Sequence, residues 1–272
     1  MNEPLVLQKL LNAPQATAIV QNGEDQVGGY VVAASAVVGL RTPAETLAAY
    51  GVDGAPEFVD VVRFGQPRLT SFSPPSKAER PWPTFASGFL HGDLLAQVWL
   101  MSRTRYPFGA EYWRIRYDGE QKQLSRYEGV ARGWVGAQRW RPTSPLVGTL
   151  ARWRGGEFFA DVVGDNVLLT AIADQAPPGF ELVHPRVWSA NRSLSDCEVF
   201  ERVFTADLEG VPVRVLRNAG ARAEVLLLTD DPAAAQRVGA GLVEPEVYEA
   251  EVDSSRLANI RGVENQLVID HN

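Results

Sequence analysis

The chain has 272 residues, of which 45% are hydrophobic and 22% are charged, a composition typical of a globular protein with a buried core. Its net charge of −7 argues against a general nucleic-acid-binding protein, because such proteins carry a basic surface. Cys197 is the only cysteine, which excludes an internal disulfide and a zinc site with four thiolate ligands.

The sequence shows neither a secretion signal nor a membrane span. Its first residues lack a basic segment followed by an apolar run, the pattern of a signal peptide. The longest apolar run, residues 30–40, is far too short to cross a bilayer. We therefore expect a cytoplasmic protein that has no membrane partner.

Residues 1–88 predict a mixed unit of short helices and strands. Residues 5–11 and 14–20 have the composition of two short helices. Thr42 precedes Pro43 and Glu45, which predicts an N-cap and a third helix that ends near Gly51. Two strands, rich in β-branched and aromatic residues, are expected at residues 28–33 and 58–64.

A proline-rich segment follows at residues 71–83. Four prolines within ten residues exclude both a helix and a central strand. We expect an extended linker that separates the first unit from a second unit at residues 89–148.

The second unit is aromatic and basic. Residues 96–100 and 111–117 read as strands, and Asp118-Gly119 predicts a hairpin turn after the latter. Strand alternation places Tyr112, Arg114 and Arg116 on one face and Trp113, Ile115 and Tyr117 on the other. We expect the face with Trp113 to pack in the core.

Positive charge is concentrated in residues 101–154. This segment holds ten arginines and Lys122 against four carboxylates, although the whole chain is acidic. Two explanations stay open. An acidic partner or anionic ligand binds this segment, or the acidic flanks of the same chain pack against it.

The last part of the chain contains an internal repeat. Residues 182–190 recur as 242–250, residues 151–155 as 206–210, and residues 167–170 as 226–229. A spacing of this size indicates a repeated structural unit. We therefore predict two small SH3-like β-barrel units at residues 149–204 and 205–269, within a fold that is mainly β with a few short helices (α+β).

No residue pattern predicts a catalytic centre, a metal site or a cofactor. Three isolated histidines, His91, His184 and His271, lack acidic partners at a fixed spacing. His91 is the best candidate for a role, but a His-Gly-Asp sequence is more typical of a capped turn. Cys197 lies between acids, which raise rather than lower a thiol pKa, so we expect it to be a buried apolar position. Asp231 before Pro232 predicts a helix cap.

Three stretches resemble actinobacterial immunity-type proteins. They are residues 153–157, residues 177–181 and the segment from Thr229 to Ala250. Proteins of this type accompany secreted NAD-degrading toxins of the necrotizing-toxin class. The resemblance implies a non-enzymatic, stoichiometric inhibitor that binds the toxin and blocks its NAD site.

A second stretch is similar to the opening of the toxin domain itself. It comprises Arg63-Phe64-Gly65, Phe72-Ser73-Pro74 and Arg80-Pro81. This similarity implies that Arg63 and Arg80 hold the phosphates of NAD, a task that suits arginine forks. The glycine-rich, glutamine-containing stretch that completes such an active site is missing.

The leading hypothesis is a protein-binding module whose partner is another protein, such as a secreted NAD hydrolase toxin. Trp, Tyr and Arg carry much of the binding energy at interfaces, so Tyr112, Arg114, Arg116 and Arg126 are the candidate contacts. The alternatives are an NAD-using enzyme of the toxin class, either a glycohydrolase or an ADP-ribosyltransferase, and a structural module of a larger assembly.

Overall fold

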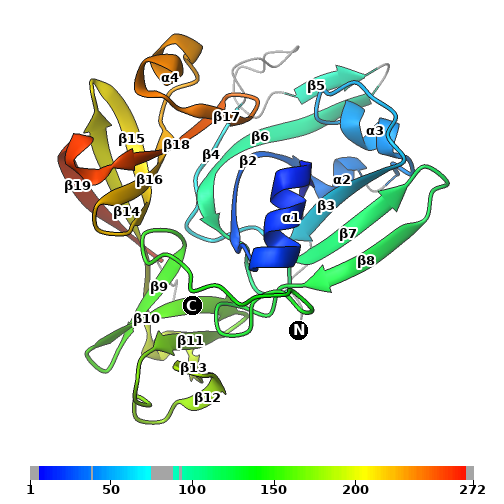
Figure 1. Cartoon of the computed structure of the whole chain (residues 1–272). Helices are drawn as coiled ribbons and strands as arrows, with labels where there is room; N and C mark the ends of the chain where they lie inside the picture. Colours follow the sequence, from blue (N-terminus) through cyan, green and yellow to red (C-terminus); the bar gives the residue numbers. More distant parts are fainter. Residues whose placement is uncertain (1–5, 38, 75–87, 92–93, 268–272) are drawn as a thin grey trace.

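The structure is a computed structural model that describes residues 6–37, 39–74, 88–91 and 94–267. Two antiparallel sheets with a few short helices make up the molecule (Figure 1). The predicted class, mainly β with short helices, is confirmed. Within the described ranges, no helix combines the length and the apolar character that a membrane crossing requires.

The first sheet has eight strands in the order β4-β6-β2-β1-β3-β7-β8, with β5 paired to β6. Its strands are β1 (Leu7–Leu11), β2 (Gln26–Ala33), β3 (Phe58–Phe64), β4 (Phe72–Ser73), β5 (Gly88–His91), β6 (Leu94–Arg105), β7 (Glu111–Arg116) and β8 (Gln121–Arg126). Its helices are α1 (Ala13–Asn22), α2 (Ala34–Val37) and α3 (Pro43–Ala48). The sheet is strongly curved, and α1 lies against it (Figure 1).

The prediction of a helix at residues 5–11 is wrong, because Leu7–Leu11 form the central strand β1. It pairs with both β2 and β3, through Leu7↔Ala33 and Leu7↔Phe64. Two neighbours satisfy its backbone groups, and its side chains are buried on both faces of the sheet. A short apolar run of this kind is compatible with a helix or a buried strand, and only pairing decides between them.

The helices predicted at residues 14–20 and from Pro43 onward are confirmed. Helix α1 begins with a capping box in which Asn12 and Gln15 bond each other's backbone, and it ends at Gly23. Helix α3 begins with the equivalent pair, Thr42 and Glu45. The Thr42–Glu45 pair is the local signal from which the sequence predicted the start of α3.

Strands from the first two predicted units join in this one sheet. Strand β6 pairs with β2, and β7 pairs with β3 in the register Val61↔Trp113. The proline-rich segment contributes the two-residue edge strand β4 at its start, and residues 75–83 lie outside the described residues.

The second sheet has eleven strands in the order β12-β13-β11-β10-β9-β14-β15-β16-β18-β17, with β19 paired to β14. Its strands are β9 (Thr149–Trp153), β10 (Gly156–Val163), β11 (Asn166–Ile172), β12 (Glu181–His184), β13 (Val187–Ser193), β14 (Glu198–Leu208), β15 (Val211–Asn218), β16 (Arg222–Leu227), β17 (Gly241–Glu244), β18 (Val247–Asp253) and β19 (Leu257–Gln266). Helix α4 (Pro232–Val238) and the short 3-10 helices η1 (Leu194–Asp196) and η2 (Ser254–Arg256) interrupt them. Asp231 caps α4, as predicted.

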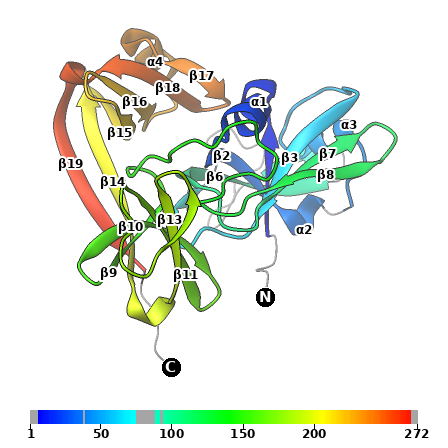
Figure 2. The ribbon, with the colours of Figure 1, turned by 60° about the horizontal axis from the view of Figure 1, so that its bottom comes forward.

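The two stretches aligned in the sequence have the same order of elements. Strands β9 to β13, η1 and β14 are followed by β14 to β18, η2 and β19, with α4 added in the second stretch. Left-handed residues fall at aligned positions, with φ of 68° at Arg186 and 64° at Glu246. Because the long strand β14 belongs to both stretches, they form one continuous sheet (Figure 2). That each is an SH3-like barrel stays a prediction.

The buried side chain of Arg105 connects the two sheets. It extends from the end of β6 and donates to the carbonyl oxygens of Val147 (3.1 Å), Thr149 and Ala160 (3.1 Å). Gly148 packs directly against this side chain: a Cβ there would lie 2.8 Å from Cγ of Arg105, and φ is +81°. Glycine is therefore required at this position for the guanidinium to reach its three acceptors.

Two buried carboxylates, Asp25 and Asp161, accompany this single guanidinium. Asp161 accepts the backbone N–H of Val130 at 2.8 Å, and the hydroxyl of Tyr127 donates to Asp25 at 3.4 Å. Burial raises the pKa of Asp161 and raises the pKa of Asp25 to about 6, although the positive charge of Arg105 opposes both shifts.

This cluster predicts a pH-dependent stability. Asp25 has a higher pKa in the folded chain, about 6, than its ordinary 3.8, so its stabilising contribution is complete below pH 3.8 and is lost as pH rises through 6. The variant Asp25→Asn has no carboxyl group at this position, so it does not lose this contribution to stability as pH rises. The difference in unfolding free energy between variant and wild type should therefore shift in favour of the variant by up to about 3 kcal/mol between pH 3.5 and pH 7.5. Urea unfolding at both pH values tests this, and an equal difference at the two would contradict it.

Candidate functional site

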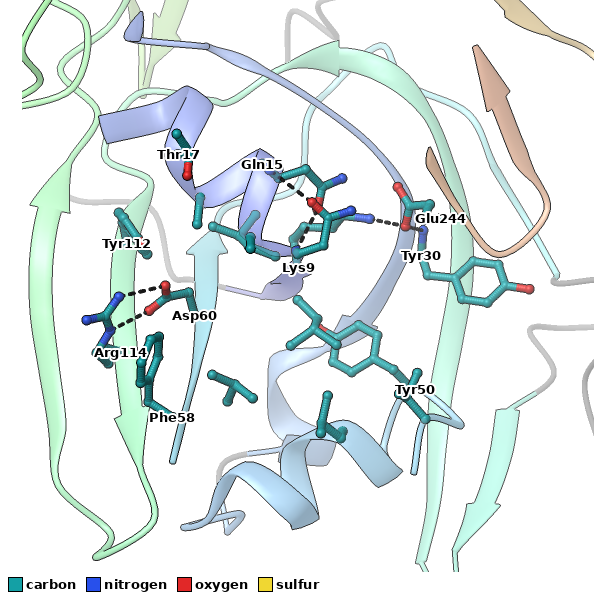
Figure 3. Close-up of a pocket in the computed structure, with 18 of the residues that line it drawn as sticks. Lys9, Gln15, Thr17, Tyr30, Tyr50, Phe58, Asp60, Tyr112, Arg114 and Glu244 are labelled. Carbon is teal, nitrogen blue, oxygen red and sulfur yellow. Dashed lines mark hydrogen bonds and ion pairs between the residues drawn. The ribbon is translucent and has the colours of Figure 1, made fainter. Parts of the chain in front are cut away.

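A cleft of ≈ 740 Å³ opens between α1, β3, β7 and the turn that joins β17 to β18. It is bounded by residues from both sheets, because Val243, Glu244 and Pro245 of that turn reach across to the first sheet. Figure 3 shows its walls, with charged side chains at two separate places and apolar ones between them.

One end of the cleft is closed by an ion pair between Lys9 of β1 and Glu244 at the end of β17. The backbone N–H of Tyr30 donates to the same carboxylate oxygen, Oε2, at 3.2 Å. The carboxylate lies over Gly29, where a Cβ would come within 2.1 Å of Oε1 and φ is +74°. Burial lowers the pKa of the Lys9 ammonium, and the charge of Glu244 opposes that shift.

The opposite part of the cleft carries a second ion pair, between Arg114 of β7 and Asp60 of β3. It is bidentate, with Nε to Oδ1 at 2.8 Å and a terminal nitrogen to Oδ2 at 2.9 Å. The guanidinium also lies over the ring of Phe58, 3.8 Å from its centre. The hydrogen bonds to Asp60 raise the pKa of Arg114, so this side chain stays charged.

Apolar side chains line the cleft between the two ion pairs. Tyr50 lies at its base, buried, and its hydroxyl donates to the backbone oxygen of Gln8 at 2.7 Å. Val20, Val52 and Phe58 form part of the lining and are 39%, 38% and 40% exposed. Three distant segments therefore present large apolar side chains to solvent at one place.

The structure brings two of the four predicted binding residues to this cleft. Tyr112 and Arg114 line it, and the pKa of Tyr112 is raised by burial and by the charge of Asp60. Arg116 instead faces Asp118 and Glu120 of its own hairpin, each at 3.6 Å. Arg126 packs beside Gly109 and is not part of the cleft lining.

Arg63, the candidate for binding NAD phosphates, is engaged within its own sheet. Its guanidinium donates to the side-chain oxygens of Gln8 (3.0 Å) and Gln121 (2.9 Å) and lies 5.2 Å from the centre of the Trp113 ring. Arg80 lies outside the described residues, as does His271.

The remaining chemical candidates lie outside the cleft lining. The backbone of His91 pairs with Leu94 in the β5–β6 ladder. His184 is half-buried in β12, with its ring 6.1 Å from that of Trp140. Cys197 is buried, as predicted, and burial raises the pKa of its thiol. Among the described residues, no group of histidine, cysteine and carboxylate side chains forms a possible metal site.

Carboxylates from the acidic flanks neutralise much of the basic middle segment. Arg103 pairs with Glu249, and Arg141 pairs with Glu24. Arg152 contacts Glu198 and Glu264 at 3.0 and 2.7 Å. These pairs favour the second of the two explanations for the charge pattern, in which the chain packs against itself.

A second exposed feature is the edge strand β19. Within the described residues it pairs on one side only, with β14, and its other edge carries no strand (Figure 2). Nine of its ten residues are exposed, and Ile260 and Val263 are 56% and 55% exposed. Unpaired strand edges of this length are templates for pairing with another chain.

The sequence did not reveal Lys9, Asp60 and Glu244 as members of one site. Lys9 and Asp60 lie on the paired strands β1 and β3 of the first sheet, whereas Glu244 lies on β17 of the second, and Lys9 was assigned to a helix. One signal was available: Glu244 replaces His184 at an aligned repeat position, which marks a difference between the two turns.

The Lys9–Glu244 pair predicts a non-additive effect on stability. Lys9→Met leaves the carboxylate buried without its cation and should lower the unfolding free energy by roughly 3–5 kcal/mol. The double variant Lys9→Met/Glu244→Gln removes both charges, so it should recover at least half of that loss. Guanidinium unfolding of both single variants and the double variant checks this cycle. Additive losses would show that the two side chains are not coupled.

Comparisons with known proteins found no relative of this chain. No protein-family model matches the chain, and neither a curated protein nor a solved structure matches it.

Proposed function

We propose that the chain is a non-enzymatic protein-binding module that pairs with its partner through β19. The observation that carries this proposal is the ten-residue edge strand, which within the described part of the chain pairs on one side only. Its exposed apolar side chains, Ile260 and Val263, supply the contacts that accompany main-chain hydrogen bonds in strand addition.

The sheet beside β19 is suited to hold this edge rigid. Strand β14 pairs with β19 from Phe200↔Gln266 to Leu208↔Leu257, with one register shift between Thr205 and Asp207. Across the face, Arg202 donates to both Glu157 and Glu264, and Arg152 donates to Glu264. A preorganised edge loses less conformational freedom on binding than a flexible one.

The resemblance to immunity-type proteins supports a secreted NAD hydrolase as the first partner to test. Part of the resemblance falls on a compact aromatic cluster, in which the rings of Trp153 and Phe180 are 6.2 Å apart. The guanidinium groups of Arg154 and Arg192 lie over Trp153, at 4.7 and 4.4 Å from its centre. Tryptophan and arginine dominate binding hot spots. A cytoplasmic location and a tandem of two related β units belong to the same proposal.

The NAD-using enzyme and the structural module stay predictions from the sequence. The Gln8 and Gln121 contacts of Arg63 do not favour the enzyme, since a phosphate would have to displace them.

The test is titration of a necrotizing-toxin-class NAD glycohydrolase with the purified chain, following NAD hydrolysis. The wild type should abolish hydrolysis at one chain per toxin molecule. Ile260→Lys/Val263→Lys places two charges along the free edge and should weaken inhibition at least tenfold, because buried unpaired charges are costly at an interface.

The matched control is Leu124→Lys/Leu182→Lys, which adds the same charge at exposed leucines of the edge strands β8 and β12. It should inhibit like the wild type. The absence of a complex with the toxin would overturn the immunity function, and equal inhibition by the β19 variant would overturn β19 as the contact surface.

A further inference from the structure

We propose that the cleft between α1, β3, β7 and the β17–β18 turn is a binding site for an uncharged, predominantly apolar small molecule. This inference does not rest on the proposed protein-binding function, because the cleft and β19 have no lining residue in common.

The size and lining of the cleft fit a small molecule. Its volume of ≈ 740 Å³ falls within the range of roughly 300–1,000 Å³ found for ligand sites. Val20, Val52 and Phe58 come from α1, the segment after α3 and β3, so their joint exposure is a product of folding rather than of one apolar segment. Exposed apolar side chains gathered at a concave site mark a binding surface.

The charges of the cleft select a neutral ligand. Both cationic side chains in its lining, Lys9 and Arg114, are paired with carboxylates. A charged ligand that enters this space would lose its hydration. An anionic ligand would also have to displace Glu244 from Lys9 or Asp60 from Arg114, and a cationic ligand would have to displace Lys9 or Arg114 from its carboxylate. An apolar body meets no such cost, since it covers the exposed valines and Phe58.

Polar groups of α1 face the same cleft and orient one end of the ligand. Thr17 is exposed and lines the cleft together with Gln21 one helical turn later (Figure 3 labels Thr17). A hydroxyl or amide on the ligand can bond to these side chains while the apolar part lies over Phe58. The ligand class is therefore an apolar molecule with one uncharged polar group, such as a long-chain alcohol.

The test uses the neutral fluorescent probe N-phenyl-1-naphthylamine and the purified full chain. The wild type should bind the probe saturably at one site. Dodecanol should displace it, whereas dodecanoate and dodecylamine, with the same apolar chain but a charge, should be at least about tenfold weaker competitors.

Two variants of α1 locate the binding. Thr17→Trp fills the cleft from an exposed helical position and should weaken probe binding at least tenfold. Asn22→Trp puts the same side chain at an exposed position of the same helix that does not line the cleft, and it should bind like the wild type. Ile260→Lys/Val263→Lys should also keep probe binding, which separates this site from the protein-binding edge.

Three results would overturn the proposal. The first is the absence of saturable probe binding to the wild type. The second is equal probe binding by Thr17→Trp and Asn22→Trp when both variants give the circular dichroism spectrum of the wild type. The third is displacement of the probe by dodecanoate or dodecylamine as effectively as by dodecanol.

Discussion

The arrangement of the two sheets depends on one buried guanidinium. Arg105 ends a strand of the first sheet and donates to three carbonyl oxygens of the segment that begins the second. A buried arginine is costly unless its donors are paired. Here both terminal nitrogens bond carbonyl oxygens, which specifies the geometry around them, whereas Nε has no hydrogen-bond partner among the described residues. Gly148 is part of that specification, because any side chain there would collide with the arginine. The two nearby carboxylates, Asp25 and Asp161, tie the stability of this junction to pH.

The cleft is a consequence of that arrangement. With the sheets in this arrangement, the β17–β18 turn reaches the first sheet, where Lys9 and the backbone of Tyr30 bind Glu244. Asn12 adds a hydrogen bond from its side chain to the carbonyl oxygen of Val243 at 3.0 Å. The same residue therefore caps α1 and holds the turn, which couples the start of the helix to the wall of the cleft.

The molecule thus presents two surfaces of different character. The edge of β19 offers main-chain donors and acceptors with exposed aliphatic side chains, which suits an extended chain. The cleft offers concave apolar walls whose charges are already paired, which suits a small neutral molecule. The turns at residues 184–186 and 244–246, which align in the sequence, make different contacts. His184 lies beside Trp140, whereas Glu244 pairs with Lys9.

Features that depend on nearby residues could be predicted from the sequence. Capping pairs such as Thr42 and Glu45, the β3 strand, the buried Cys197 and the mainly β class all follow from local hydrogen bonding or side-chain composition. That residues 7–11 form a central strand could not be predicted, since three leucines around Gln8 and Lys9 fit a short helix as well as a strand until β2 and β3 pair with them. The tertiary structure also decided which charges meet: Asp60 and Arg114 are joined by strand register, and Lys9 and Glu244 by the packing of the two sheets. Such long-range pairs leave no spacing pattern in a sequence, because the residues between them are free to vary.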